Sequence, residues 1–260
     1  MLLSMNDLKN YAIRATDGDI GHVKDFYFDS VTWTVRYLIV DTGIWLSSRR
    51  VLISPTAIGH PDRAEKVLPV SVTMEQVKNS PDVDTEKPVS RQYEMGYLDY
   101  YGYAPYWEGI GPWGSVVQLD VTIPEMGLEN SGGGQGGLSA AQPRAAGNTD
   151  DLHLRSCKTL VGCQVQANDG DVGRIQGMLV DEEIWIIRYL VVDAGNGWTG
   201  NQVLVAPENV LSINWRESTV SVNLTRQAVK DTSSYDLAAP TNDGEEAVFK
   251  AQHHHTSTLV

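Results

Sequence analysis

The chain has 260 residues, which is enough for two domains that each bury a modest core. Its formal net charge of -13 opposes direct nucleic-acid binding, because each phosphate contact needs a cation. Two cysteines are too few for a disulfide framework or a structural zinc site. The start of the chain lacks the features of a signal peptide, and no window approaches the roughly 20 apolar residues that span a bilayer. We therefore expect a cytoplasmic protein with no transmembrane segment, which a partner could still hold at a membrane.

Short strands separated by turns are predicted for the first 92 residues. Asp17-Gly18-Asp19 predicts a tight turn between two strands, because Asp caps nearby backbone and Gly accepts a positive φ. Residues 35–41 are a run of aromatic and branched side chains, which predicts a strand buried on both faces. Further strands are predicted at 51–54 and 67–72. Five or six such strands favour a mainly β fold built on a small antiparallel barrel, since closure removes exposed edges.

A short helix is predicted to follow this barrel. Thr73 is its expected N-cap, Gln76 stands at the reciprocal position of a capping box, and the helix should end near Asn79.

An aromatic segment comes next, with six tyrosines and two tryptophans in residues 93–113. Two interpretations stay open and do not exclude each other. The rings can fold back as a lid over the first barrel, with their hydroxyls in water. Alternatively they can form a docking surface for a protein partner, because Tyr and Trp give a large rigid contact area at low entropy cost. The candidate partner-binding residues are Tyr97, Tyr100, Tyr101, Tyr103, Tyr106, Trp107 and Trp113.

The rest of the chain contains a linker, a second module and a tail. Residues 118–123 alternate in polarity as one extra strand would, and residues 127–147 are rich in Gly, Ser, Ala and Gln, which is typical of a flexible linker. The last two dozen residues are acidic and poor in apolar side chains, which predicts disorder. The predicted division is a first module at 1–92, an aromatic-rich extension at 93–126, a Gly-rich linker at 127–150, a second module at 151–237 and a disordered acidic tail at 238–260.

The second module repeats the first at a fixed offset of 152 residues. Residues 17–84 align with 169–236 without a gap, and 21 of the 68 positions are identical. A duplication explains this match, and Thr225 should begin the second copy of the short helix. The shared landmarks are Asp17-Gly18-Asp19-x-Gly21 with Asp169-Gly170-Asp171-x-Gly173, Trp33 with Trp185, Arg36-Tyr37-Leu38-x-Val40-Asp41 with Arg188-Tyr189-Leu190-x-Val192-Asp193, and Val51-Leu52-x-x-Pro55 with Val203-Leu204-x-x-Pro207.

These landmarks together resemble the PRC-barrel family. That family includes the cytoplasmic domain of the photosynthetic reaction centre H subunit and the C-terminal domain of the ribosome maturation factor RimM. The resemblance covers roughly residues 10–85 and 162–237, and the aromatic run at 100–107 is similar to a segment that follows the barrel in stand-alone bacterial members. It implies a β-barrel that binds other macromolecules, without a shared catalytic residue set. The chain lacks the H subunit's membrane-spanning helix and RimM's N-terminal domain, so neither specific role is carried over.

No residue set in the sequence supports catalysis or a cofactor. Asp41 and Asp193 each precede a small residue and a Gly, so turn formation explains them better than acid–base chemistry. Arg36 and Arg188 are expected to make hydrogen bonds at the barrel rim. Small buried or incidental thiols are the simplest interpretation of the two cysteines. His253-His254-His255 are expected to be part of a solvated tail and not a metal site. Gly132 to Gly137 are expected to be linker, because they lack the Lys-Ser/Thr of a phosphate-binding loop.

The leading hypothesis is therefore a non-enzymatic binding or scaffold protein whose two barrels pair within one chain or form a homo-oligomer. Its partner is expected to be a protein of unknown identity. Two alternatives follow from the family resemblance: a ribosome or RNA-processing accessory similar to RimM, and a reaction centre or electron-transfer accessory similar to the H subunit.

Overall fold

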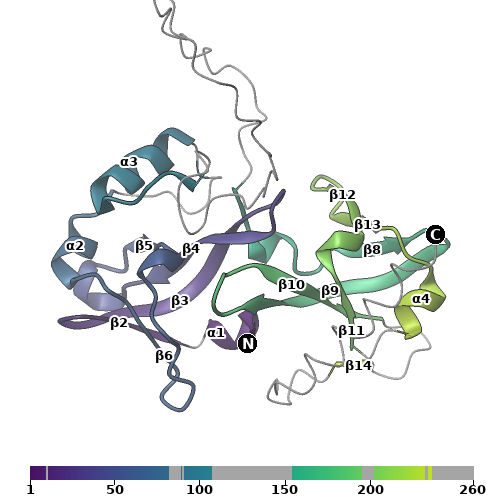
Figure 1. Cartoon of the computed structure of the whole chain (residues 1–260), viewed down its shortest axis with the longest axis horizontal. Helices are drawn as coiled ribbons and strands as arrows, with labels where there is room; N and C mark the ends of the chain where they lie inside the picture. Colours follow the sequence, from purple (N-terminus) through teal and green to yellow (C-terminus); the bar gives the residue numbers. More distant parts are fainter. Residues whose placement is uncertain are drawn as a thin grey trace, which may run out of the picture.

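The computed structural model describes residues 1–9, 11–81, 89, 91–106, 154–194, 202–231 and 234–235. These residues form two β-sheets that lie side by side, one for each module (Figure 1). The mainly β prediction is confirmed. The first sheet has the order β5-β4-β3-β2-β6, and β7 also pairs with β3. Its strands are β2 (Ala12–Ala15), β3 (Gly18–Asp29), β4 (Thr34–Asp41), β5 (Arg50–Ile53), β6 (Val67–Pro69) and β7 (Leu154–Ser156).

The second sheet repeats this arrangement. Its path β11-β10-β9-β8-β13 matches the first sheet strand for strand, and β12, β14 and β1 add to it. Its strands are β1 (Leu2–Ser4), β8 (Gln164–Ala167), β9 (Gly170–Asp181), β10 (Ile187–Asp193), β11 (Gln202–Val205), β12 (Val210–Asn214), β13 (Thr219–Val222) and β14 (Ser234–Tyr235). The described helices are α1 (Met5–Leu8), α2 (Met74–Lys78), α3 (Arg91–Tyr101) and α4 (Arg226–Asp231), with 3-10 turns η1 (Gly43–Leu46), η2 (Pro55–Ala57), η5 (Cys157–Thr159) and η6 (Pro207–Asn209).

Neither sheet is purely antiparallel, which corrects one part of the prediction. β2 pairs with β6 in parallel, and β8 pairs with β13 in parallel. The reason is that the chain crosses to the far side of the sheet between β5 and β6 instead of turning back in a hairpin.

The predicted strand at 35–41 and the predicted helix are both present. The first seven residues of β4 are buried, as expected for a strand covered on both faces. In α2 the Thr73 hydroxyl accepts from the Gln76 amide at 3.1 Å, and the Gln76 side-chain oxygen accepts from the Thr73 amide at 2.9 Å. The capping box is thus confirmed.

The Asp-Gly-Asp turn also caps the helix that follows each barrel. The Asp17 carboxylate accepts a hydrogen bond from the Met74 amide at 2.8 Å. Asp169, its counterpart, accepts from the Arg226 amide at 2.6 Å. The repeated Asp therefore has one job in both modules, which is to satisfy a free amide at a helix N-terminus.

Gly21 and Gly173 are required by a close approach of two strands. A Cβ at Gly21 would overlap the carbonyl oxygen of Asp41, and a Cβ at Gly173 would overlap that of Asp193. We expect Gly21→Ala to lower the free energy of unfolding by about 3 kcal/mol, because backbone cannot give way as a side chain can. Gly96→Ala is the control, since a Cβ there meets open space in α3. Urea unfolding of both variants checks this, and equal stabilities would contradict it.

Each module lends its first strand to the other. β1, from the start of the first module, pairs with β9 of the second sheet, with Leu2 opposite Asp181. β7, from the start of the second module, pairs with β3 of the first sheet, with Leu154 opposite Asp29. The two strands occupy the same place in the repeat, so the exchange is reciprocal.

The β3–β4 and β9–β10 hairpins meet with the same reciprocity. The Val35 amide donates to the Trp185 carbonyl at 2.8 Å, and the Ile187 amide donates to the Trp33 carbonyl at 2.8 Å. Both tryptophans have left-handed backbones, with φ of 55°. Contacts in which i meets j and j meets i are the mark of a two-fold interface, here inside a single chain.

One hydrophobic core runs through both modules. It includes Leu8 and Phe28 from the first copy and Leu160 and Val180 from the second, all fully buried. The predicted pairing of the two barrels is therefore present, and the module boundaries in the sequence do not separate two independent cores. The predicted linker at 127–150, the tail at 238–260 and the strand at 118–123 lie outside the described residues. Among the described helices, none has the length and apolar character needed to cross a bilayer.

Candidate partner-binding site

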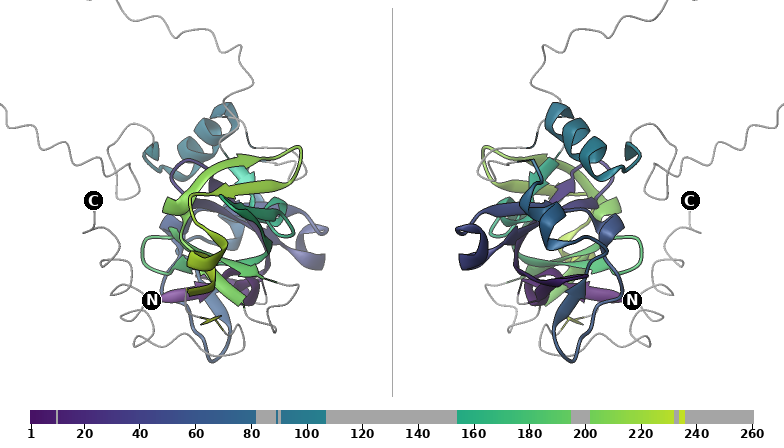
Figure 2. Two further views of the ribbon diagram at one scale, coloured as in Figure 1. Left: turned by 90° about the vertical axis from the view of Figure 1, so that its right-hand side faces the viewer. Right: turned by 90° about the vertical axis from the view of Figure 1, so that its left-hand side faces the viewer.

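The described part of the aromatic segment, up to Tyr106, folds back onto the first sheet. α3 carries four of its tyrosines and lies against the side of the sheet that faces away from the second module (Figures 1 and 2). The sheet presents an apolar surface there, which we call the outer face of the first sheet. Its described residues are Tyr27, Tyr37, Ile39, Leu52 and Leu154, and Val89, Tyr97 and Leu98 pack on them.

Tyr97 is the centre of this contact. It is 2% exposed, its hydroxyl donates to the Leu52 carbonyl at 3.1 Å, and it accepts from the Ser54 amide at 3.0 Å. Its ring meets the edge of Tyr37 at a centroid distance of 5.0 Å. The hydroxyl therefore serves backbone groups at the end of β5, and the ring closes the outer face.

Tyr101 and Tyr103 continue the layer. Their rings stack at 5.6 Å with an angle of 8°, and Tyr101 also packs on Tyr97 at 4.8 Å. Tyr97, Tyr101 and Tyr103 thus lie folded back over the barrel, as the lid interpretation expects. Its expectation that the hydroxyls lie in water is wrong for Tyr97, whose hydroxyl is buried and bonded to the backbone of Leu52 and Ser54. The use of the three tyrosines by a partner stays a prediction.

A buried carboxylate joins the lid to the sheet. Glu94 is 2% exposed and accepts hydrogen bonds from the Tyr37 hydroxyl at 3.3 Å and from the Tyr106 hydroxyl at 2.8 Å. Sequence reasoning missed Glu94. The available signal was its spacing, since it lies three residues before Tyr97 and so on the same side of a helix.

Arg36 lies beside this carboxylate network. Its guanidinium carbon is 3.8 Å from the centre of the Tyr106 ring, and Nη2 is 3.7 Å from Oδ2 of Asp29. Burial lowers the pKa of Arg36, and the nearby Tyr106 and Asp29 oppose that shift. In the second module the equivalent pair, Arg188 and Asp181, is 3.5 Å apart, and the Arg188 side chain is 44% exposed. The repeated arginine thus pairs with an acid of its own hairpin.

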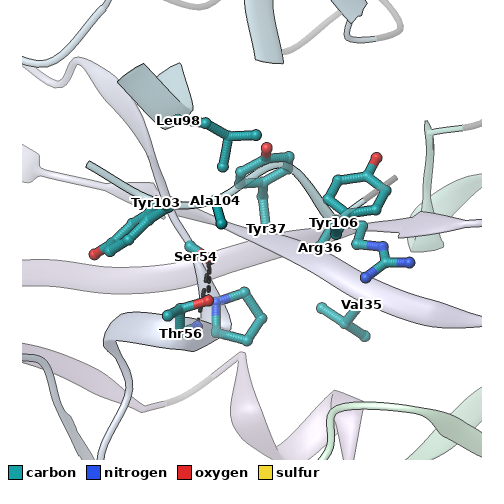
Figure 3. Close-up of a pocket in the computed structure, with 10 residues that line it drawn as sticks. Val35, Arg36, Tyr37, Ser54, Thr56, Leu98, Tyr103, Ala104 and Tyr106 are labelled. Carbon is teal, nitrogen blue, oxygen red and sulfur yellow. Dashed lines mark hydrogen bonds between the residues drawn. The ribbon is translucent and has the colours of Figure 1, made fainter. Parts of the chain in front are cut away.

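A small pocket lies between the lid and the sheet (Figure 3). Leu98 and Tyr103 line it from the lid, and Val35 and Thr56 from the sheet side. Its volume of about 40 Å³ is room for a water molecule and too little for a substrate.

Tyr100 is the lid tyrosine most open to solvent. Its side chain is 40% exposed, and its hydroxyl donates to the Gln76 carbonyl of α2 at 2.8 Å. Met95, on the same helix, is 58% exposed. The two predicted tryptophans, Trp107 and Trp113, lie outside the described residues.

The loop between β4 and β5 exposes two neighbouring large apolar side chains, and sequence reasoning missed it. Ile44 is 98% exposed and Trp45 is 37% exposed. Gly43, Ser47 and Ser48 all have left-handed backbones, which is a strained state for serine. The signal lay in the alignment, because Ile-Trp-Leu at 44–46 faces Asn-Gly-Trp at 196–198 in the second copy.

The other candidate residues fall in structural positions. Asp41 accepts from the Gly43 amide at 3.0 Å, which confirms its predicted role in the turn. Both cysteines are buried, as predicted. Burial, and then the nearby Asp25, raise the pKa of Cys157 well above its usual value, which keeps this thiol protonated. The described residues contain no group of three possible metal ligands, and His253 to His255 lie outside them.

The buried tyrosines predict a loss of stability at alkaline pH. Burial raises the pKa of Tyr101 from 10.0 to about 12 and raises the pKa of Tyr37 well above 10.0. Because folding favours the neutral phenols, this stabilisation is complete below pH 10 and is lost as the pH rises toward 12 and beyond. Urea unfolding across that interval should show the decline. Tyr101→Phe should make the decline shallower, with Tyr37 still contributing, and an unchanged profile would contradict the assignment.

Comparison with known proteins agrees with this architecture. The family model of the PRC-barrel domain matches residues 2–76. These residues are a PRC-barrel domain. They contain α1, every strand of the first sheet except β7, and β1, the strand that the first module lends to the second sheet. The family match stops before the second copy, whose likeness to this PRC-barrel domain rests on the 152-residue offset and on its matching strand order. The search of the curated proteins found no match to the chain.

Proposed function

We propose that this protein is a non-enzymatic scaffold that binds a protein partner through its first PRC-barrel module. The observation that carries the proposal is the loop at 43–48, where Ile44 is almost fully exposed and the following Ser47 and Ser48 hold left-handed backbones. Single exposed apolar residues are common, but strain held at an exposed apolar tip is typical of a functional surface.

α2 links this loop to the lid. Arg49, at the end of the loop, donates to the carbonyl of Lys78, the last residue of α2, and to the carbonyl of Ser80, two residues further on. Tyr100 of α3 donates to the Gln76 carbonyl in the same helix. The proposed docking surface therefore consists of Ile44, Trp45 and Tyr100 around α2. Of the seven aromatic residues predicted for the site, this surface includes Tyr100.

Surface binding suits this architecture better than catalysis. The described pocket is too small for a substrate, the buried Glu94 and Arg36 are committed to the lid, and the thiol of Cys157 is protonated. The net charge of -13 favours a partner with a basic rim around an apolar contact. A cytoplasmic location belongs to the proposal as well.

Affinity capture from native lysate with the full chain tests the proposal. Ile44→Asp should abolish capture of a stoichiometric protein partner, because a charge would enter the centre of the contact. Val31→Asp is the matched control, since Val31 is 70% exposed on another turn of the same module.

The same capture separates the alternatives. Nuclease treatment should leave the partner bound, whereas loss on treatment would favour an RNA-linked role. Recovery of a ribosomal protein, or of a subunit of a membrane complex, would select one of the two family roles. Equal capture by both variants would rule out the loop as the binding site.

A further inference from the structure

The surfaces through which the two modules face each other are equivalent in backbone but not in side chains. β1 pairs with β9 as β7 pairs with β3, and the carbonyls of Trp33 and Trp185 accept reciprocal hydrogen bonds. A backbone of this kind is self-complementary, so by itself it would accept a like module as readily as an unlike one. The choice between like and unlike modules must therefore come from side chains that differ between the two copies.

One such difference lies where α1 meets β9. The Asn6 side-chain amide donates to the Gln176 carbonyl at 3.1 Å. A Cβ on the next residue, Gly177, would lie only 2.8 Å from Nδ2 of Asn6, so the glycine leaves the space that this amide occupies. The residue at the equivalent position of the first module is Asp25. A first module therefore has no such space to offer Asn6.

The reciprocal place, where η5 meets β3, holds a different pair of residues. Asp25 is 9% exposed, and its carboxylate accepts a hydrogen bond from the Ser156 hydroxyl. Lys158 stands at the position equivalent to Asn6, so this place combines a cation with an acid. A second module has Gly177 in place of Asp25. Paired with its like, it would leave the Ser156 hydroxyl without a carboxylate to bond.

An ion pair between the modules shows the same asymmetry. Nη2 of Arg63, in the turn before β6, is 3.0 Å from Oε2 of Glu182, which follows β9 and has a side chain that is 17% exposed. The equivalent residues at the 152-residue offset are Trp215 for Arg63 and Ser30 for Glu182. Two first modules would therefore bring Arg63 to a serine, and two second modules would bring Glu182 to a tryptophan.

We propose that the module-facing surfaces are a complementary pair that selects an unlike module. The selecting side chains are those of the three places described above. The partner that fits the first module is thus a second-type module, with a glycine that admits Asn6 and an acid that meets Arg63. Any association between two chains would join the first module of one to the second module of the other. The inference does not depend on the proposed partner protein.

Competition between like and unlike modules tests the proposal. The chain is cleaved at a protease site inserted in the interval from 107 to 153, with a Strep tag in one batch and a FLAG tag in another, each just before the site. The fragments are unfolded together in urea, refolded by dilution and captured through the Strep tag. Pairing without selection would place a FLAG-tagged first module on about a quarter of the captured molecules, and we expect at least about tenfold less. Recovery near a quarter would overturn the proposal.

Exchanging the selecting residues should reverse the choice. Asn6→Lys with Asp25→Gly gives the FLAG-tagged first module the residues that the second module has at these two positions. Its capture by an unmodified first module should rise at least about tenfold, because Asn6 there meets a glycine and Asp25 meets a lysine. Glu65→Lys with Asp19→Gly is the matched control, since both acids pair with Arg14 of their own module. Capture no higher than that of the control would overturn the assignment.

The intact chain gives a readout that needs no refolding of fragments. Gly177→Asp should lower Tm by at least about 4 °C, because the new side chain takes the space of Asn6. In an Asn6→Ala background the same change should lower Tm by no more than about half as much, since that space is then free. An equal drop in both backgrounds would overturn the proposal. Should Gly177→Asp unfold the chain, Gly177→Ala meets the same amide with a smaller side chain and decides the comparison.

Discussion

A chain cut between its two modules should remain one particle. A specific protease site inserted between Gly133 and Gly134 allows cleavage of the purified protein. We expect the two fragments to elute together at the size of the intact chain, because β1 completes the second sheet and β7 completes the first. The common core adds to this, since it draws fully buried side chains from both copies. The melting temperature should become dependent on concentration, as it does for any non-covalent pair.

Matched variants make this test specific. Leu154→Asp places a charge at a side chain that is 2% exposed within the exchanged strand, and the cleaved fragments should then separate. Val161→Asp is the control, because Val161 is 37% exposed a few residues further on. Unmodified fragments that separate, with each keeping its own circular dichroism spectrum, would show that the modules fold independently.

Replacing Tyr97 should destabilise the first module more than any other change in the lid. Tyr97→Ala removes a fully buried ring, for which we expect a loss of about 3–5 kcal/mol in the free energy of unfolding. Tyr97→Phe keeps the ring but leaves the Ser54 amide without its acceptor, which should cost about 1–3 kcal/mol.

Tyr100→Ala serves as the control for both variants. Its ring is 40% exposed, so the expected loss is about 1 kcal/mol or less. Denaturant titration followed by circular dichroism gives all three values. If Tyr97→Ala were no more costly than Tyr100→Ala, the aromatic segment would not be part of the folded core.

Local structure was predictable because the determinants lie close together in the chain. The strand at 35–41, the capping box at Thr73 and the turns at Asp17 and Asp41 all follow from neighbouring residues. The strand exchange was not predictable, since β1 and β7 have three residues each and equivalent positions in a repeat. Their side-chain pattern is the same whether they pair within their own module or with the other one. Whether each strand pairs within its own module or with the other one depends on the length of chain between the modules and on the core that both modules share.

The sequence identified the aromatic segment as a candidate site, but it did not predict which side chains are buried or what they contact. The aromatic count identified the segment, but the burial of Tyr97 depends on Leu52 and Ser54, which no pattern within residues 93–113 contains. Tyr93, Tyr97 and Tyr101 are spaced four apart, which could have indicated a helix with aromatic rings along one face. The exposed Ile44 was hidden for the opposite reason, because an apolar residue in a short loop reads as core.

The exchange of first strands also governs the order in which the protein can fold as it is synthesised. The residues 27–29 of β3 pair with β4 on one side, and their pairing with β7 on the other side must wait until the ribosome has made the interval from 107 to 153 and then β7. β1 waits longer still, because β9 is made later. Pairings so distant in sequence form slowly, and an open edge on a nascent chain is a template for a neighbour's strand. Polysomes crowded with this message would therefore favour exchange between chains, and a cell that makes it slowly would favour the closed monomer.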